Sequence, residues 1–198
     1  MAEIATTAFS SLSSLETLFL SQHNLKAISQ VTLPSSLLTL AADTGSITSI
    51  SAPFHFTDST SNSLEHIGLP YNPIQNISGN AFSKLHNLKT LDLGSTKVTN
   101  LDHVSFPPSL TNLVLSETKL TNIPKSLTSL TKLETLYLFE VDGLACSCDD
   151  KALAQWYHKR MNSPLDIDLH GSCMFNGTGT DITDFLGNFH KHCPSSYY

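Results

Sequence analysis

Four cysteines, Cys146, Cys148, Cys173 and Cys193, are the residues whose spacing points most clearly to chemistry, and all lie in the last 53 residues of the chain. Cys146 and Cys148 are separated by one residue and are poorly placed to bond each other. Each is therefore expected to form a disulfide with Cys173 or Cys193, which would fasten this segment to the structure before it.

A zinc site is the alternative role for the same residues. Cys146 and Cys148 would supply two ligands, and the others would come from Cys173, Cys193, His170, His190 or His192. Structural zinc sites usually have two to four residues between the first pair of cysteines, whereas here there is one. The sequence therefore favours disulfides and no metal.

Patterns that would indicate catalysis are missing from the sequence. The nine histidines are scattered without an HExxH pair, and there is no GxSxG motif. The segment 177–179, Gly-Thr-Gly, lies between half-cystines and reads as a turn, not as a phosphate-binding loop. We therefore expect neither enzymatic activity nor a cofactor.

Composition limits the class of protein further. A hydrophobic content of 40% is enough for a buried core, and no apolar run approaches the ~20 residues that span a bilayer. With a formal net charge of −6 and only 11 lysines and arginines, a nucleic-acid partner is not expected.

A repeated pattern, LxxLxLxxNxLxxI with substitutions, must position all of these residues. Its copies begin, at intervals of 22, 27, 24, 22 and 23 residues, at Leu15, Leu37, Leu64, Leu88, Leu110 and Leu133. The LxL part alternates as a strand does, and the later apolar residues turn the chain back under the same core. Because each copy leaves apolar flanks for its neighbours to bury, the pattern predicts a solenoid with capped ends.

Over residues 4–145 this pattern resembles the leucine-rich-repeat family. The resemblance implies an α/β fold in which a curved solenoid carries a parallel β-sheet on its concave face. The chain departs from the family at the Asn position, which Asn72 keeps and which Thr96 and Thr118 replace. The long second repeat contains segment 54–62, rich in turn formers, which is expected to bulge from the flank as a surface loop.

The CxC pair, Trp156 and the two later cysteines resemble the C-terminal flanking cap of extracellular leucine-rich-repeat proteins such as Toll-like receptors and Slit. That resemblance implies the pairs Cys146–Cys173 and Cys148–Cys193. It also implies three parts: repeats in 1–145, a cap in 146–193 and a tail in 194–198.

Two short helices are expected in the cap. The first spans 149–161, with Leu153, Trp156, Tyr157 and Arg160 on one face, whose apolar members should cover the last coil. The second spans 181–190, where apolar residues recur at helical spacing.

The cysteines also indicate the compartment. Disulfides persist in oxidising surroundings, so an extracellular or secreted glycoprotein is expected, with sequons at Asn76 and Asn176. Residues 1–14 do not read as a signal peptide, and Ile4, Phe9 and Leu12 resemble the back half of an earlier repeat. We therefore expect a fragment of a longer ectodomain, with any membrane anchor beyond Tyr198.

The outward residues of successive strands should form one continuous surface for a ligand. Around the strands, seven acids, including Glu16, Asp43 and Asp92, face the single cation Lys89, which favours a basic partner; the alternative is that the acids serve solubility. Tyr137 and Phe139 should point outward on the last strand, or else pack under the cap. The residues expected to contact a ligand are Glu16, Phe19, Asp43, His66, Asp92, Asn112, Glu117, Tyr137 and Phe139.

The resemblance implies recognition of a protein or glycan ligand, as in a Toll-like or similar receptor of innate immunity. A secreted matrix or adhesion protein with a structural role is the alternative, and the recognition arm of a larger enzyme is a third. Neither the ligand nor the oligomeric state is indicated.

Overall fold

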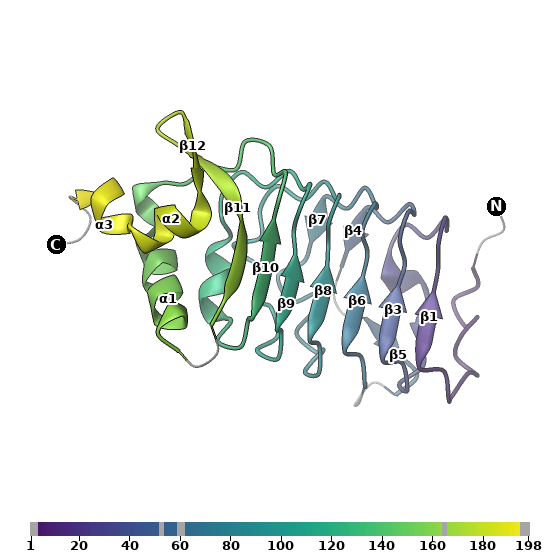
Figure 1. Cartoon of the computed structure of the whole chain (residues 1–198). Helices are drawn as coiled ribbons and strands as arrows, with labels where there is room; N and C mark the ends of the chain where they lie inside the picture. The colour runs from purple at the N-terminus through teal and green to yellow at the C-terminus, as the bar shows by residue number, and fades with distance from the viewer. Residues whose placement is uncertain (1–3, 52–53, 59–61, 164–165, 195–198) are drawn as a thin grey trace.

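The computed structural model describes residues 4–51, 54–58, 62–163 and 166–194. One long sheet carries a strand from each coil, side by side from the N-terminal to the C-terminal end (Figure 1). Neighbouring strands are parallel, except the antiparallel last pair. In spatial order they are β1 (Thr17–Phe19), β3 (Thr39–Ala41), β6 (His66–Gly68), β8 (Thr90–Asp92), β9 (Asn112–Val114), β10 (Thr135–Leu138), β11 (Asp168–Phe175) and β12 (Thr178–Asp181). The predicted α/β solenoid with a parallel sheet is confirmed.

The strands are held in register by their central side chains. In each pair of neighbours the middle residues face each other, and all of them are buried: Leu18, Leu40, Ile67, Leu91, Leu113, Leu136 and Leu169. Because side chains alternate along a strand, the residues on either side of each central one point out of the sheet. The same register therefore aligns the outward residues into rows.

Outside the long sheet, the chain of each coil runs back to the next strand through short strands and turns. Strand β2 (Thr32–Leu33) pairs with β5 (His55–Phe56), and β4 (Ser49–Ile50) pairs with β7 (Asn76–Ile77). Two 3-10 turns complete the return path, η1 (Ile28–Gln30) and η2 (Lys125–Ser129).

The segment predicted to bulge as a loose loop, 54–62, is partly ordered by the coil before it. Residues 55–56 form β5, and Phe54 is buried with its ring centroid 6.3 Å from that of Phe82. Phe82 in turn stacks on Phe106 at 6.1 Å, so three successive coils share one aromatic core. The prediction was wrong for residues 54–57 because Phe54 is drawn into this core; residues 59–61 lie outside the described part.

At the Asn position of the repeat, Asn72 links its coil to the coil before it. Asn72 Nδ2 donates to the Ala42 carbonyl at 2.7 Å, and its Oδ1 accepts from the Ile47 amide at 3.1 Å. Asn72 can reach the preceding coil because the equivalent position there is Gly45, which has no side chain. The imidazole of His23, from the coil before that, lies next to Gly45 and fills the space that a side chain would take. Thr96 and Thr118 are buried at this position and bond only within their own coils, to the carbonyls three residues earlier.

Two disulfides fasten the C-terminal cap to the last coil. Cys146 bonds to Cys173, and Cys148 bonds to Cys193, which is the pairing that the resemblance implies. Every cysteine is thereby bonded, so none is left as a thiolate ligand for zinc. Among the described residues, no group of three or more His, Cys, Asp or Glu is placed to hold a metal ion.

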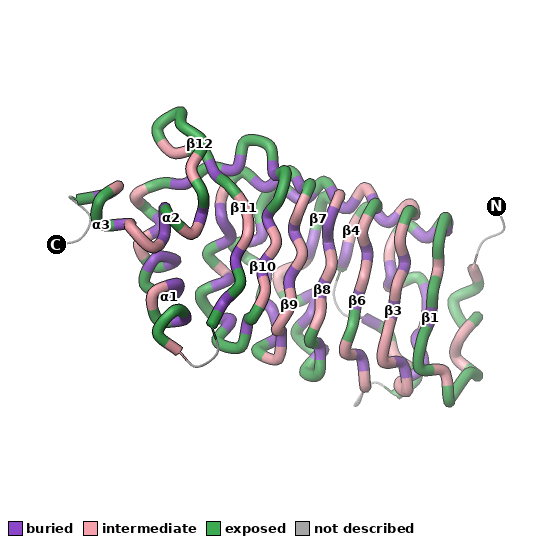
Figure 2. Tube along the Cα trace, in the orientation of Figure 1, coloured by how far each residue is buried: buried purple, intermediate pink, exposed green. Residues whose placement is uncertain are grey.

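The first predicted cap helix is present, beginning as the 3-10 turn η3 (Cys148–Asp150) and continuing as α1 (Lys151–Met161). Ser147 starts it, since its hydroxyl accepts from the Asp149 amide while Asp150 accepts from the Ser147 amide. The face that carries Trp156 and Arg160, whose apolar members were predicted to cover the last coil, is buried. Figure 2 shows buried, intermediate and exposed residues alternating along α1.

The second cap helix differs from the single helix predicted for 181–190. It is divided into α2 (Ile182–Gly187) and α3 (Phe189–His192). Asp181 caps α2 by accepting from the Thr183 and Asp184 amides. The break between the two helices follows Gly187, and glycine has a low helix propensity. After the break, Phe189 is buried and Cys193 is bonded to Cys148.

At the N-terminal end, Ile4 and Phe9 pack partly buried against the core, whereas Leu12 is exposed. Within the described residues, no helix is both long and apolar enough to cross a membrane.

Candidate functional site

The outward side of the long sheet, which we call the sheet face, is built from two rows of aligned residues. The first row is polar along its whole length, and the second has aromatic rings near both ends with smaller residues between them. The first row is Thr17, Thr39, His66, Thr90, Asn112, Thr135 and Asp168. The second row is Phe19, Ala41, Gly68, Asp92, Val114, Tyr137 and His170.

Of the nine residues predicted to contact a ligand, five lie in the strands of the sheet face. These five are Phe19, His66, Asp92, Asn112 and Tyr137. The other four flank the strands: Glu16 comes just before β1, and Asp43, Glu117 and Phe139 follow β3, β9 and β10. The structure thus brings the predicted residues to one side of the molecule, with most of the acids at the margins.

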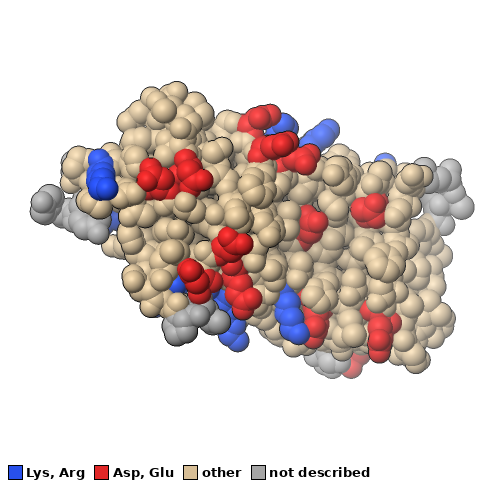
Figure 3. Space-filling view, viewed as in Figure 1, with Lys and Arg blue, Asp and Glu red and all other residues tan. Residues whose placement is uncertain are grey.

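A repeated backbone turn explains why the acids after the strands leave the sheet face. In each of six coils, one residue shortly after the strand has a positive φ: Gln22, Thr44, Tyr71, Ser95, Glu117 and Glu140. This left-handed conformation bends the chain away from the sheet. Of the seven predicted acids, Asp92 alone lies within a strand, and Figure 3 shows the acids of this side in separate groups, not as one continuous patch.

Several of the marginal acids already have partners. The Ser21 hydroxyl donates to Asp43 at 2.8 Å and lowers the pKa of that carboxyl. Lys89 lies 2.7 Å from Glu65 and lowers its pKa in the same way. Ser95 donates to Glu117 at 3.0 Å. These contacts hold the margins in place, and Lys89 offsets the charge of Glu65.

Asp92 is different because it is half-buried in the middle of the sheet face. Burial raises the pKa of its carboxyl, and the hydrogen bond from the Gly94 amide, at 2.8 Å, opposes that rise. A partly desolvated carboxylate keeps a stronger interaction with an incoming cation or donor than one in open water does.

Three rings cluster where the sheet meets the cap. Tyr137 and Phe139 come from β10 and the residue after it, and His170 comes from β11 beside them. Their centroids are 5.8 Å apart for Tyr137 and Phe139, 5.4 Å for Tyr137 and His170, and 5.3 Å for Phe139 and His170. Phe139 is 48% exposed, so the alternative that these rings pack under the cap is not what the structure shows. Asp168 lies at the edge of the cluster, with Oδ1 2.7 Å from His170 Nε2.

His170 and Asp168 were not among the predicted ligand contacts. They lie in β11, a cap strand that extends the sheet, whereas the segment between half-cystines was predicted to be cap alone. The available signal was the alternation of Ile167, Asp168, Leu169 and His170, in which the apolar residues are buried as in an LxL strand.

Both sequons lie outside the two rows of the sheet face. Asn76 is exposed in β7, which pairs with β4 away from the long sheet. Asn176 is exposed in the turn between β11 and β12, with a φ of 50°.

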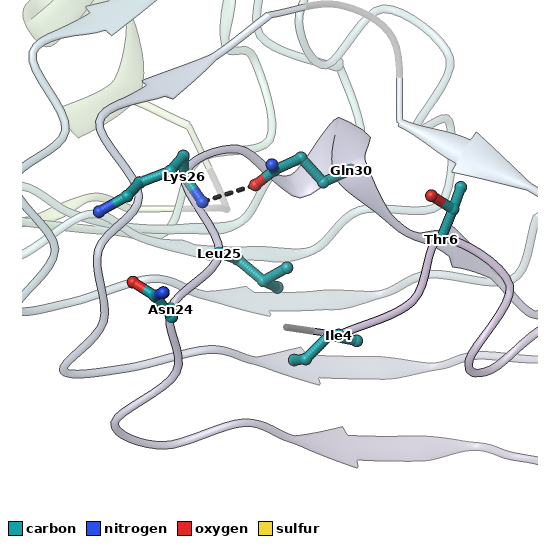
Figure 4. Close-up of a pocket in the computed structure, with 6 residues that line it drawn as sticks. All are labelled: Ile4, Thr6, Asn24, Leu25, Lys26 and Gln30. Atoms are coloured by element: carbon teal, nitrogen blue, oxygen red, sulfur yellow. Dashed lines mark hydrogen bonds between the residues drawn. The ribbon is translucent and has the colours of Figure 1, made fainter. Parts of the chain in front are cut away.

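A separate pocket of about 330 Å³ lies at the N-terminal end, between residues 4–6 and the first coil (Figure 4). Gln30 lines it, but its Oε1 already accepts from the Lys26 and Ala27 amides at 2.6 and 3.0 Å. That side chain therefore stabilises the turn, and the pocket offers a poorer set of contacts than the sheet face.

Comparison with known proteins supports the repeat assignment. Residues 62–107 and 86–140 each match the family described as leucine rich repeat. No curated protein matches the chain. The matched residues cover the coils from β6 to β10, and the solenoid continues the same geometry on both sides of them.

Proposed function

We propose that this leucine-rich-repeat solenoid with a cysteine-containing cap is a non-catalytic extracellular module that recognises a protein ligand through its sheet face. Leucine-rich-repeat domains generally mediate protein binding. The observation that carries the proposal is the cluster of Tyr137, Phe139 and His170, partly exposed through Phe139, at the end of a broad polar face. Aromatic residues of this kind are enriched among the residues that dominate protein interfaces.

The remaining features of the sheet face fit this role. Its rows are formed by outward side chains that the core does not require, so they are free to match a partner. The two sequons lie off these rows, so glycans attached there would leave the rows accessible. The resemblance of the cap to those of Toll-like receptors and Slit supports placing the module in a receptor ectodomain.

The extracellular part of the proposal rests on the two disulfides, since such bonds persist in oxidising compartments. Non-reducing peptide mapping of the protein isolated from its own cells tests it. We expect both disulfides to be intact and at least one sequon to be glycosylated. Four free thiols in the native protein would contradict an extracellular location.

Site-specific photocrosslinking tests the recognition surface. A benzophenone amino acid placed at Asn112 on the sheet face should give a protein adduct in the native setting. The same group at two exposed residues off this face, Gln75 and Lys84, provides matched controls. Adducts at the control positions but not at Asn112 would place the ligand elsewhere. The absence of adducts at all three positions would favour a structural role for the repeats.

A further inference from the structure

We infer that Tyr137, Phe139, His170 and Asp168 form a subsite for an arginine or lysine side chain that the protein ligand presents. This inference rests on the proposed function, because it names the chemistry of the partner at the same surface. It extends that function from a binding face in general to one defined contact.

The arrangement of the rings gives the first argument. In a single stack of three rings, the outer two would be about twice as far apart as neighbours are. Here all three centroid separations lie between 5.3 and 5.8 Å, and the planes are inclined by only 18–27°. The rings therefore do not form one linear stack, and their nearly parallel planes face a common direction. The face of an aromatic ring carries negative electrostatic potential and attracts a cation placed over it.

Exposure gives the second argument. Phe139 is 48% exposed, and the side chains of His170 and Asp168 are 40% and 65% exposed. A ligand can reach both the rings and the carboxylate without displacing part of the fold. Exposed apolar surface next to polar residues is typical of interaction sites in soluble proteins.

Charge gives the third argument and selects the occupant. Asp168 adds a carboxylate at the edge of the rings, and its Oδ1 lies 2.7 Å from His170 Nε2. Glu134 and Glu140 flank β10. The strands around the rings and the residues next to them contain no lysine or arginine in segments 112–117, 134–140 and 168–175. A guanidinium group can stack on a ring while its edge donates to a carboxylate, so arginine fits this combination best.

The direct test is an NMR titration of the secreted, disulfide-bonded protein with 13C-labelled aromatic residues. A hexa-arginine peptide is the probe, and a neutral hexasaccharide of N-acetylglucosamine tests whether the rings bind a sugar instead. We expect the peptide to shift the ring signals of Tyr137, Phe139 and His170, and to bind less tightly as salt is added.

Three variants separate the contributions. Phe139→Leu keeps an apolar surface but removes the ring face, Phe139→Ala removes both, and Asp168→Asn removes the charge while keeping the shape. Each should weaken hexa-arginine binding by about three- to tenfold, the range expected for losing one cation–π or charged contact. Tyr71→Ala is the matched control, because Tyr71 is also an exposed aromatic residue, at 60%, but lies outside both rows of the sheet face, and its substitution should leave the affinity unchanged.

Unchanged binding in all three variants, or ring shifts caused by the hexasaccharide and not by the peptide, would overturn the inference. Folding is checked by the backbone amide spectrum, which should match the parent protein because all substituted side chains are exposed. Failure of this subsite is distinguishable from failure of the proposed function, because a crosslink at Asn112 would still identify a protein ligand of different chemistry.

Discussion

His23, Gly45 and Asn72 occupy the same position in three successive coils and depend on one another. His23 is buried, and its Nδ1 accepts from the Leu25 amide at 3.3 Å. Asn72 crosses to the amide of Ile47 in the preceding coil. These three coils therefore fill one shared space with a large side chain, no side chain and a medium-sized side chain.

Gly45→Ala should therefore destabilise the protein. The added Cβ would lie 2.1 Å from His23 Cε1 and 2.7 Å from Asn72 Oδ1, so both neighbours must shift. We expect a loss of about 2–3 kcal/mol in the free energy of unfolding, measured by chemical denaturation, as for other overpacked interior sites. Adding His23→Ala should restore part of that loss. Gly68→Ala is the control, because its nearest neighbour would be 3.8 Å away. A loss as large at Gly68 as at Gly45 would contradict this shared packing.

Asp92 predicts a pH-dependent effect. Burial raises the pKa of this carboxyl in the folded state above its unfolded value, so the stability it contributes is present at low pH and lost as pH rises through the folded pKa. Asp92→Asn should therefore stabilise the protein at neutral pH, by a few tenths of a kcal/mol because solvent partly screens the group. The gain should vanish below the unfolded pKa of about 3.9. Thermal unfolding at pH 3.5 and pH 7 measures the difference, and an equal gain at both would refute the assignment.

Helix α1 closes the solenoid through polar contacts as well as apolar ones. Trp156 Nε1 donates to the Leu130 carbonyl at 3.2 Å, and the Arg160 guanidinium donates to the carbonyls of Thr131 and Leu133. These carbonyls lie in the chain that leads into β10. The cap thus satisfies backbone groups that the next coil of an endless solenoid would otherwise cover.

Arg160→Met tests this closure. It retains much of the side-chain volume but leaves two carbonyls without their donor, which should cost about 3 kcal/mol in unfolding free energy. Lys159→Met, at an exposed position on the same helix, should change stability little. Equal effects of the two substitutions in urea denaturation would show that α1 holds the last coil by apolar contacts alone.

The coils could be predicted from sequence because each one repeats the same buried residues at a nearly fixed interval. The pairing of β11 could not, because one alternating segment within a cysteine-rich region has no repeat to support it. Its place is fixed by distant contacts: Leu169 aligns with Leu136, and Cys173 bonds to Cys146. His170 and Asp168 were missed for the same reason, since only this pairing brings them to Tyr137. The acids that follow the strands lie at the margins because of the positive φ there, which is not visible as a residue type, since Gln22, Tyr71 and Glu140 share it.

At the scale of the whole molecule, the two ends of the sheet are held differently. Strand β1 has a neighbour on one side in the described structure, and Leu12 and Phe19 near it are exposed. At the other end, two disulfides, three helices and an antiparallel strand cover the last coil. Because the stability of a solenoid is approximately a sum over neighbouring coils, this difference should produce a gradient of local stability along the chain.

Hydrogen exchange at one equivalent amide in each of four coils measures that gradient. The amides of Leu20, Leu69, Leu93 and Leu115 each donate to the next strand, to the carbonyls of Ala41, Asp92, Val114 and Tyr137 at 2.7–2.9 Å. Their bonds are alike, so differences in exchange report on coil stability and not on bond geometry. We expect Leu20 to exchange at least about tenfold faster than Leu93 and Leu115, which corresponds to a difference of about 1.4 kcal/mol in opening free energy. Reduction of the disulfides should accelerate Leu115 more than Leu69, because the cap then no longer secures the last coil. Identical rates at all four amides would instead mean that the array opens as one cooperative unit, and the sheet face would then be as rigid at Phe19 as it is beside His170.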